Sequence, residues 1–187
     1  GALEPRITAL VDEALDRVAA AGQADLVEEL AFPLPFAVIS GMLGMPPTDH
    51  ARIRELGGRL VRSLEPVFDP GELKDISAAG TEMTAIIREM IGWKRAHPAD
   101  DLLTALIAAE DDGDRLSDEE LIAQVVLLYV AGHETTVNLI GNGTIALLRH
   151  PDQLALLRDR PDLAGNAVEE FLRYDSPVQQ TRRITLR

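Results

Sequence analysis

No proline interrupts the sequence between Ser117 and His150, and this long stretch constrains the fold more than any other feature. Ser117 and Glu120 have the spacing of a capping box, in which a hydroxyl and a carboxylate satisfy free N–H groups at a helix start. We therefore predict a helix over about 118–149, roughly 48 Å long and able to cross a whole domain. Its first half is apolar on all sides, which is typical of a buried helix.

Apolar residues at helical spacing, together with turn residues, predict helices along most of the remaining chain. The predicted elements are a helix from Ile7 to Val18 that stops at Gly22, a short extended piece before Pro35, a helix from about Pro35 to Gly44, a helix capped by Thr48 or Asp49 and ending near Ser63, a loop at 65–71, a helix over about 72–96, a helix from Asp100 to about Glu110, an acidic turn at 111–115, and helices beginning at Pro151 and Pro161, the second ending near Tyr174. Residues 178–187 read as a strand, so the predicted fold class is mainly α with little strand.

Composition limits the classes of protein to which the chain can belong. Its 187 residues, 46% hydrophobic and 26% charged, suit one globular domain over 1–187. The net charge of −13 argues against nucleic acid or an anionic membrane as a partner. The chain has no cysteine, which excludes disulfides and thiolate metal ligands within it. The longest apolar run, from Leu121 to Gly132, is too short to span a bilayer.

The segment Val130 to Thr136, VAGHETT, places a carboxylate and two hydroxyls inside this apolar run. Burying Glu134 without a partner costs several kcal/mol, and two adjacent threonines lower helix propensity. We therefore expect this segment to serve chemistry and not stability.

Three simpler motifs carry little weight on their own. His133 and Glu134 match the start of a zinc-protease pattern, but position 137 is valine where a second histidine is needed. Gly141, Gly143 and Ala146 match a loose dinucleotide fingerprint, but they lie inside the predicted helix with no strand before them. The pair Glu170 and Arg173, three residues apart, usually means an exposed ion pair.

Taken together, the sequence motifs indicate a protein family far more specifically than any one of them alone. AGHETT in a long helix, Glu-x-x-Arg beginning 35 residues after Thr135, and RYDSPVQ from that arginine onward together resemble the bacterial cytochrome P-450 family. The stretches DLLTALIAAEDDGDRLSDEELI and LLRHPDQLALLRDRPDLAGNAVEEFLRYDSPVQ are similar to that family as well. The resemblance covers essentially the whole chain and implies part of the cytochrome P-450 fold, with the helix at about 118–149 at its centre.

The resemblance implies roles for the middle of the long helix. Glu134 and Thr135 correspond to the catalytic acid–alcohol pair, in which the carboxylate relays protons and the hydroxyl presents them to dioxygen. Ala131 and Gly132, with Thr135, lie over haem b in the family, where the helical hydrogen bonding is locally opened. Arg183 matches a position that pairs with a haem propionate.

Other positions carry implied roles of binding or support. Leu127, Val130, Ala131 and Val178 fall where the family lines its substrate pocket, and the loop at 65–71 belongs to the lid over that pocket. Glu170 and Arg173 form a structural pair that meets a further arginine from a later loop. The cysteine that ligates the haem iron has no counterpart here, so no metal ligand is assigned.

From the resemblance we expect an internal fragment of a cytoplasmic, haem-dependent monooxygenase, lacking the first helices and the cysteine loop and inactive alone. The parent would hydroxylate a small apolar organic substrate with dioxygen and electrons from a ferredoxin-type donor. A different class stays open, namely a haem-free helical binding or interaction protein on the same scaffold.

Overall fold

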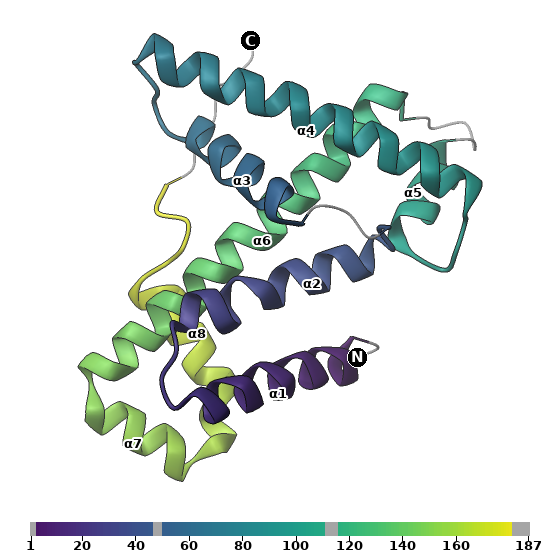
Figure 1. Cartoon of the computed structure of the whole chain (residues 1–187). Coiled ribbons are helices and arrows are strands. Elements are labelled where there is room, and N and C mark those ends of the chain that lie inside the picture. Colours follow the sequence, from purple (N-terminus) through teal and green to yellow (C-terminus); the bar gives the residue numbers. More distant parts are fainter. Residues whose placement is uncertain (1–2, 47–49, 111–115, 181–187) are drawn as a thin grey trace, which may run out of the picture. The chain divides into compact units, whose positions relative to one another are not determined.

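The computed structural model describes residues 3–46, 50–110 and 116–180, and every regular element in these ranges is helical (Figure 1). The mainly α fold class is therefore confirmed. The helices are α1 (Glu4–Ala21), α2 (Pro33–Met42), α3 (His50–Val61), α4 (Pro70–Ala96), α5 (Leu102–Glu110), α6 (Asp118–Arg149), α7 (Pro151–Asp159) and α8 (Ala164–Tyr174). Short turns of other helical types lie at Val27–Ala31, Arg62–Leu64 and Pro161–Leu163. None of the helices in the described ranges is long and apolar enough to cross a membrane.

The long helix α6 begins and ends as the sequence predicts. The Ser117 hydroxyl accepts a hydrogen bond from the Glu120 N–H at 3.3 Å, and the Glu120 carboxylate accepts one from the Ser117 N–H at 2.8 Å. The Ser117 N–H and the Ser117 hydroxyl, which donates to the same carboxylate at 2.9 Å, lower the pKa of Glu120 because they favour its charged form. The helix runs for 32 residues without the local opening expected at Ala131 and Gly132. In this structure residues 131 and 132 are part of a continuous α-helix, so the expected opening is absent here.

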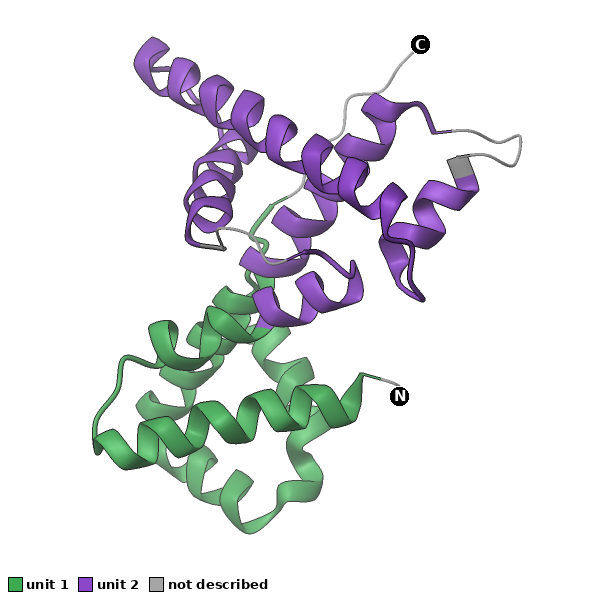
Figure 2. Ribbon diagram, turned by 45° about the vertical axis from the view of Figure 1, so that its right-hand side comes forward, with its two compact units in different colours: residues 1–34, 135–187 green, residues 35–134 purple. Residues whose placement is uncertain are grey.

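The described residues divide into two units, which are considered separately (Figure 2). Unit 2 is Pro35–Glu134, and its core is formed by side chains from α2 to α6. Its largest fully buried side chains are Leu43, Leu56, Met83, Ile87, Leu103, Leu121 and Val125. The first half of α6 is buried on one side only, because Leu127 is 57% exposed and Ala123 is also exposed. The predicted burial on all sides is therefore wrong, and an apolar face is left uncovered within the described chain.

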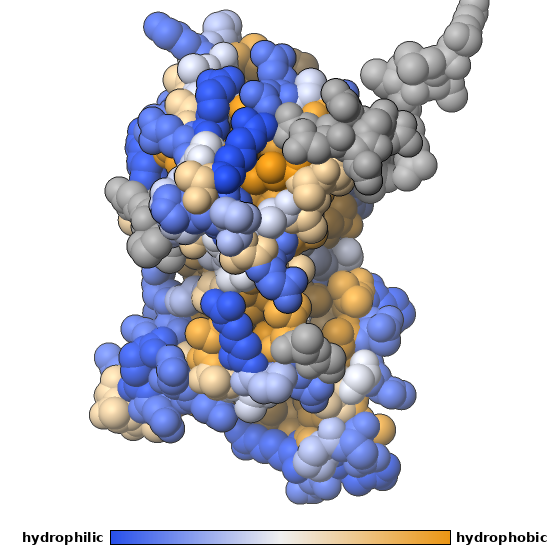
Figure 3. Space-filling view, turned by 90° about the vertical axis from the view of Figure 1, so that its right-hand side faces the viewer, coloured by the Kyte–Doolittle hydropathy of each residue, from blue (hydrophilic) through white to orange (hydrophobic). Residues whose placement is uncertain are grey.

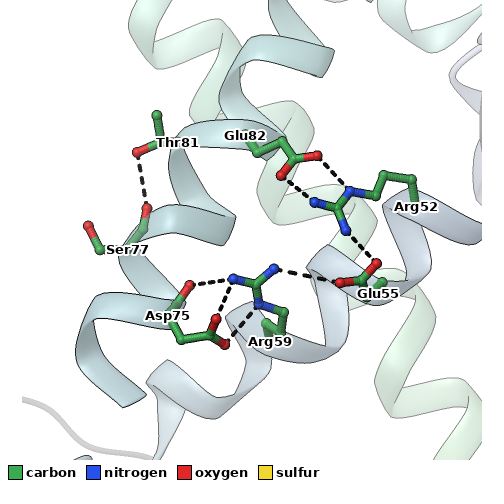
Figure 4. A network of polar contacts seen from close by, with 7 residues as sticks. All are labelled: Arg52, Glu55, Arg59, Asp75, Ser77, Thr81 and Glu82. Carbon is green, nitrogen blue, oxygen red and sulfur yellow. Dashed lines mark hydrogen bonds and ion pairs between the residues drawn. The ribbon is translucent and has the colours of Figure 1, made fainter. Parts of the chain in front are cut away.

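Ion pairs join α3 to α4 along one edge of unit 2 (Figure 4). Arg52 donates two hydrogen bonds to the Glu82 carboxylate, at 2.6 and 2.5 Å, and also pairs with Glu55. Arg59 similarly donates to Asp75, at 2.9 and 2.6 Å. Because both guanidinium groups bind their partners on α4 in bidentate fashion, the pairs fix the register of the two helices as well as their separation.

A buried ion pair fixes the junction of α2, α4 and α5. Lys94 Nζ lies 2.5 Å from Asp101 Oδ2, and the two side chains are only 3% and 8% exposed. Asp101 also caps α5 by accepting the Thr104 N–H at 2.9 Å, whereas the sequence predicted that this helix begins at Asp100. Burial raises the pKa of Asp101, but the hydrogen bonds from Lys94 and Thr104 outweigh it, so the net pKa is lowered.

The lowered pKa sets the direction of the pH dependence. The Asp101 charge stabilises the fold at any pH above its unfolded pKa of about 3.9, and this stabilisation is lost as the pH falls through the lower folded value.

Gly44 makes room for the Asp101 carboxylate. Its φ is +58°, in the left-handed region, and a Cβ there would overlap that carboxylate. The position therefore excludes a side chain for two reasons, backbone conformation and lack of space.

Unit 1 comprises 1–34 and 135–187, and its described part contains α1, the C-terminal half of α6, α7 and α8. Gly143 on α6 lets α8 pack closely, since a Cβ at that position would lie 2.8 Å from Phe171 Cδ2. Asn142, beside it, donates a hydrogen bond to the Asp175 carbonyl at 3.3 Å. The glycines that match a dinucleotide fingerprint are thus part of a helix, and Gly143 serves packing.

Several predicted boundaries need correction. The piece before Pro35 is helical and not extended, because Asp25 accepts the N–H groups of Val27 and Glu28 and starts a turn. The loop at 65–71 ends earlier, since Asp69 caps α4 and Pro70 is its first residue.

Other predicted elements lie partly or wholly outside the described residues. The caps at Thr48 and Asp49 and the acidic turn at 111–115 fall there. Residues 178–180 form no strand, and the rest of the predicted strand is also outside the described ranges. The single domain over 1–187 stays a prediction.

Replacing Gly44 with alanine should strongly destabilise the protein, because it adds backbone strain of about 1–2 kcal/mol and displaces Asp101 from Lys94. Disrupting a buried pair typically costs about 3–5 kcal/mol. Gly22→Ala is the matched control, since Gly22 has φ +74° but open space around its Cβ position. Chemical denaturation of the complete protein measures both losses; equal losses would show that Asp101 accommodates the new methyl group.

Candidate functional site

The middle of α6 presents different side chains to different surroundings. Ala131 and Gly132 are exposed, His133 is buried, and Glu134 and Thr135 are half-buried. Consecutive residues of an α-helix point about 100° apart, so neighbours in this segment face different ways. Glu134 is the last residue of unit 2 and Thr135 the first of unit 1; each is therefore described with its own unit.

His133 belongs to the core of unit 2. Its ring is 8% exposed and lies edge-on to Phe36 of α2, with 5.7 Å between the ring centroids. Tyr129, one turn earlier, also packs against Phe36 and forms a 3.1 Å hydrogen bond with the Ser40 hydroxyl. Burial raises the pKa of Tyr129, although the Ser40 bond acts in the opposite direction. His133 thus points into the protein, away from the exposed face of α6.

Glu134 borders a small cavity between α3 and α6. The cavity measures about 20 Å³ and is lined by Phe36, Ile53, Arg54, Gly57, Val61, Met83, Tyr129, Val130, His133 and Glu134. A volume of this size accommodates about one water molecule. The sequence identified Glu134 but not Arg54 or Gly57; the only signal for the latter was a pair of adjacent glycines within a predicted helix.

A larger groove in unit 2 collects two of the predicted substrate-binding residues. It measures about 510 Å³ and includes Leu127 and Val130 of α6. Its other lining residues are Leu60, Ser63, Leu64, Gly80, Thr84, Arg88, Glu119, Ile122, Ala123 and Val126. Ala131 does not line this groove, and Val178 is an exposed residue of unit 1. The structure therefore brings Leu127 and Val130 together in this groove.

Leu127, Ala131 and Thr135 recur every four residues and so follow one stripe of α6. Leu127 and Ala131 are exposed, although both are apolar. A Cβ at Gly132 would lie 3.6 Å from Ile39, in ordinary contact, so packing within unit 2 does not require glycine there. Exposed apolar side chains recur in both units, and a space-filling view shows them as orange areas among charged residues (Figure 3).

The predicted structural pair in α8 is formed. Arg173 donates to both carboxylate oxygens of Glu170, at 2.7 and 2.6 Å. The hydrogen bond from Arg173 lowers the pKa of Glu170. The two side chains are 70% and 55% exposed, so within the described residues this is a surface ion pair. The further arginine expected to join it comes from a loop with no counterpart in this chain.

The predicted haem neighbour Arg183, with Arg182 beside it, lies outside the described residues. No metal ligand was assigned from the sequence, and the described residues contain no group of three histidine, aspartate or glutamate side chains able to hold a metal ion.

Comparisons with known proteins agree with the geometry. A sequence profile described as Cytochrome P450 matches residues 72–160. Cytochrome P450 107B1 of Saccharopolyspora erythraea is 49% identical over 94% of this chain, and Vitamin D(3) 25-hydroxylase of Pseudonocardia autotrophica is 47% identical over 95%. The crystal structure of P450BioI in complex with an acyl carrier protein ligated to hexadec-9Z-enoic acid is similar over 95% of this chain and 46% of its own, with TM-score 0.88 and 36% identity.

Over most of its length the chain is similar in sequence and in fold to proteins of the cytochrome P450 family. It spans 42% and 43% of the lengths of the two curated relatives named above. The family implies a haem cofactor, and the exposed stripe through Leu127 and Ala131 fits one face of a flat, largely apolar group of this kind. The iron ligand expected from the resemblance, a cysteine, is not among the 187 residues.

Replacing Arg173 with lysine in the complete protein should lower the haem-loaded yield severalfold, if Glu170 and Arg173 support the haem region there. Lysine keeps the charge but loses the planar two-pronged donor. Arg160→Lys is the matched control, because Arg160 makes the same bidentate contact with Asp162 on the surface. Haem absorbance per mole of purified protein measures the effect, and equal haem content in the two variants would contradict a supporting role for Arg173.

Proposed function

We propose that the complete protein is a haem-dependent monooxygenase that uses dioxygen to hydroxylate a small organic molecule. The observation that carries the proposal is AGHETT in the middle of α6, where a half-buried acid and alcohol follow an exposed stripe of small and apolar side chains. The relatives named as a cytochrome P450 and as a hydroxylase support the same reaction class. They also make the haem-free binding protein the weaker alternative.

In this proposal each residue of the segment has a distinct task. Haem, when bound, supplies the binding and activation of dioxygen. The Thr135 hydroxyl would donate a hydrogen bond toward dioxygen and pass on a proton as the electron donor supplies electrons. The Glu134 carboxylate, half-buried beside its cavity, takes protons from the solvent side and restores the one that Thr135 gives up. Ala131 and Gly132 contribute by being small, which leaves space above the cofactor.

The finer parts of the proposal concern cofactor type and partners. We assign haem b as the cofactor, with Ala131, Gly132, Thr135 and Arg183 as its neighbours from this chain. Leu127, Val130, Ala131 and Val178 are the proposed substrate contacts, and the apolar walls of the 510 Å³ groove favour a small apolar substrate. A ferredoxin-type protein is the proposed electron donor, and the cytoplasm is the proposed location.

Thr135→Ala in the complete, haem-loaded protein tests the mechanism. Alanine favours the helix, so folding and substrate binding should be nearly unchanged. Reducing equivalents should be consumed within a few-fold of the normal rate, while product per equivalent falls on the order of tenfold as hydrogen peroxide is released, since ordered proton delivery is lost. Oxygen uptake, peroxide and product are measured together.

Two further variants sharpen this test. Thr136→Ala removes the adjacent, exposed hydroxyl and should keep product formation coupled to electron use. Glu134→Gln should slow turnover itself, because the relay from solvent is interrupted. Full coupling in Thr135→Ala would reduce Thr135 to a packing residue and remove the mechanistic basis of the proposal.

A further inference from the structure

The larger groove of unit 2 contains two charged side chains to which the proposed function gives no task. Its α4 wall is formed by Gly80, Thr84 and Arg88, which recur every four residues and so share one stripe of that helix. Its α6 wall begins with Glu119 and continues with apolar side chains as far as Val130. The groove is therefore apolar over most of its length, with one cationic and one anionic side chain in its lining.

Arg88 and Glu119 lie toward the same end of this groove. Arg95 of α4 and Asp118 of α6 form an ion pair at 2.7 Å, so the C-terminal part of α4 meets the start of α6. Arg88 is about two helical turns before Arg95, and Glu119 follows Asp118 directly. From Glu119 to Val130 the axis of α6 rises by roughly 16 Å. The charged end is thus well separated from the middle of α6.

Neither of these two charges is neutralised within the part of the chain that the structure describes. Arg88 and Glu119 are both exposed, and they pair neither with each other nor with another described side chain. By contrast, three arginines at or just after the end of α3 bind carboxylates of α4, namely Arg52, Arg59 and Arg62. Two opposite charges that line one groove without pairing are available to a ligand that lies between them.

Thr84 adds a hydroxyl group one helical turn before Arg88. A threonine inside a helix often donates to the carbonyl four residues earlier, as Thr81 does to Ser77 at 3.0 Å. Thr84 is half-buried, yet it forms no hydrogen bond of this kind with the described residues. Its hydroxyl is therefore a further donor that a ligand in the groove can use.

We propose that this groove selects substrates that are apolar over most of their length and carry an α-amino acid group at one end. The inference rests on the proposed function, because it names the class of molecule that the monooxygenase acts on. Arg88 and Thr84 donate hydrogen bonds to the substrate carboxylate, and Glu119 accepts them from its ammonium group. The apolar body then lies against the α6 side chains that lead to Val130.

The balance of charges favours a zwitterion over a simple acid or a simple amine. A carboxylic acid would leave Glu119 unpaired and close to a second negative charge, and an amine would leave Arg88 close to a second positive charge. The net charge of the chain, −13, also repels an anion that approaches from solvent. An α-amino acid group has no net charge at neutral pH and offers a partner to both side chains.

Calorimetric titration of the complete, haem-loaded protein tests this selectivity with three probes that share one alkyl chain. α-Aminododecanoic acid carries both charges, its N-acetyl derivative keeps only the carboxylate, and its methyl ester keeps only the ammonium group. The free amino acid should bind about tenfold more tightly than either derivative, since each derivative loses the hydrogen bonds of one charged group. Equal or tighter binding of either derivative would overturn the proposed substrate class.

Variants of the complete protein show which side chain recognises which charge. Arg88→Gln should abolish the preference over the methyl ester, and Glu119→Gln the preference over the N-acetyl derivative. Lys74→Gln and Glu89→Gln are the matched controls, because they remove the same charges from exposed positions on α4 that do not line the groove. Both controls should keep both preferences. If the preferences survive in the groove variants, or are lost equally in the controls, the inference is wrong.

Product analysis separates this inference from the proposed function. The complete protein is given dioxygen, a ferredoxin-type electron donor and either α-aminododecanoic acid or dodecane. Hydroxylation of the amino acid, reduced in Arg88→Gln but not in Lys74→Gln, supports both proposals. Hydroxylation of dodecane alone would overturn the substrate class and leave the reaction in place. If neither compound is hydroxylated while the amino acid binds with the expected dependence on Arg88 and Glu119, the ligand site stands and the proposed reaction is wrong.

Discussion

The buried contact between Lys94 and Asp101 is the interaction on which the packing of unit 2 depends most. Two charges removed from water are stabilised only if every remaining hydrogen-bonding site is used. Each oxygen of the Asp101 carboxylate accepts a hydrogen bond, one from Lys94 and one from the Thr104 N–H. The same carboxylate needs the space that Gly44 leaves at the end of α2. One ion pair thus links the ends of three helices and ties α4, with its bidentate contacts to α3, to the rest of the core.

Most helices could be predicted from the sequence because their signals are local. The capping box at Ser117 and the prolines at 151 and 161 act within one helical turn, and α6, α7 and α8 follow them closely. The turn at Val27–Ala31 was misread because its cap, Asp25, lies before an apolar stretch that also suits a strand. The Lys94–Asp101 pair could not be foreseen, since nothing in either residue's neighbourhood distinguishes a buried charge from an exposed one.

The candidate site also combines residues that the sequence identifies with neighbours that only the packing of the helices brings to them. Glu134 and Thr135 stand out in sequence because polar groups interrupt an apolar run, and their assignment follows from the family resemblance. The α3 side of the cavity beside Glu134 depends on how α3 and α6 pack, which spacing along one chain does not encode. The exposure of Leu127 was likewise unforeseen, because a helix that is apolar all round does not reveal which of its faces the neighbouring helices cover.

The succession of Glu134 and Thr135 along α6 has a consequence for how charge can cross the protein. Solvent cannot pass through an α-helix along its axis or across it, because the backbone fills the interior of the helix. Two adjacent side chains, about 100° apart around the helix, can reach different flanks while their attachment points are only about 3.8 Å apart. A proton that moves from the Glu134 side chain to the Thr135 side chain therefore passes from one flank of the helix to another in a single step. In the proposed mechanism, the proton source and dioxygen can then lie on different flanks of the helix, with no continuous file of water between them.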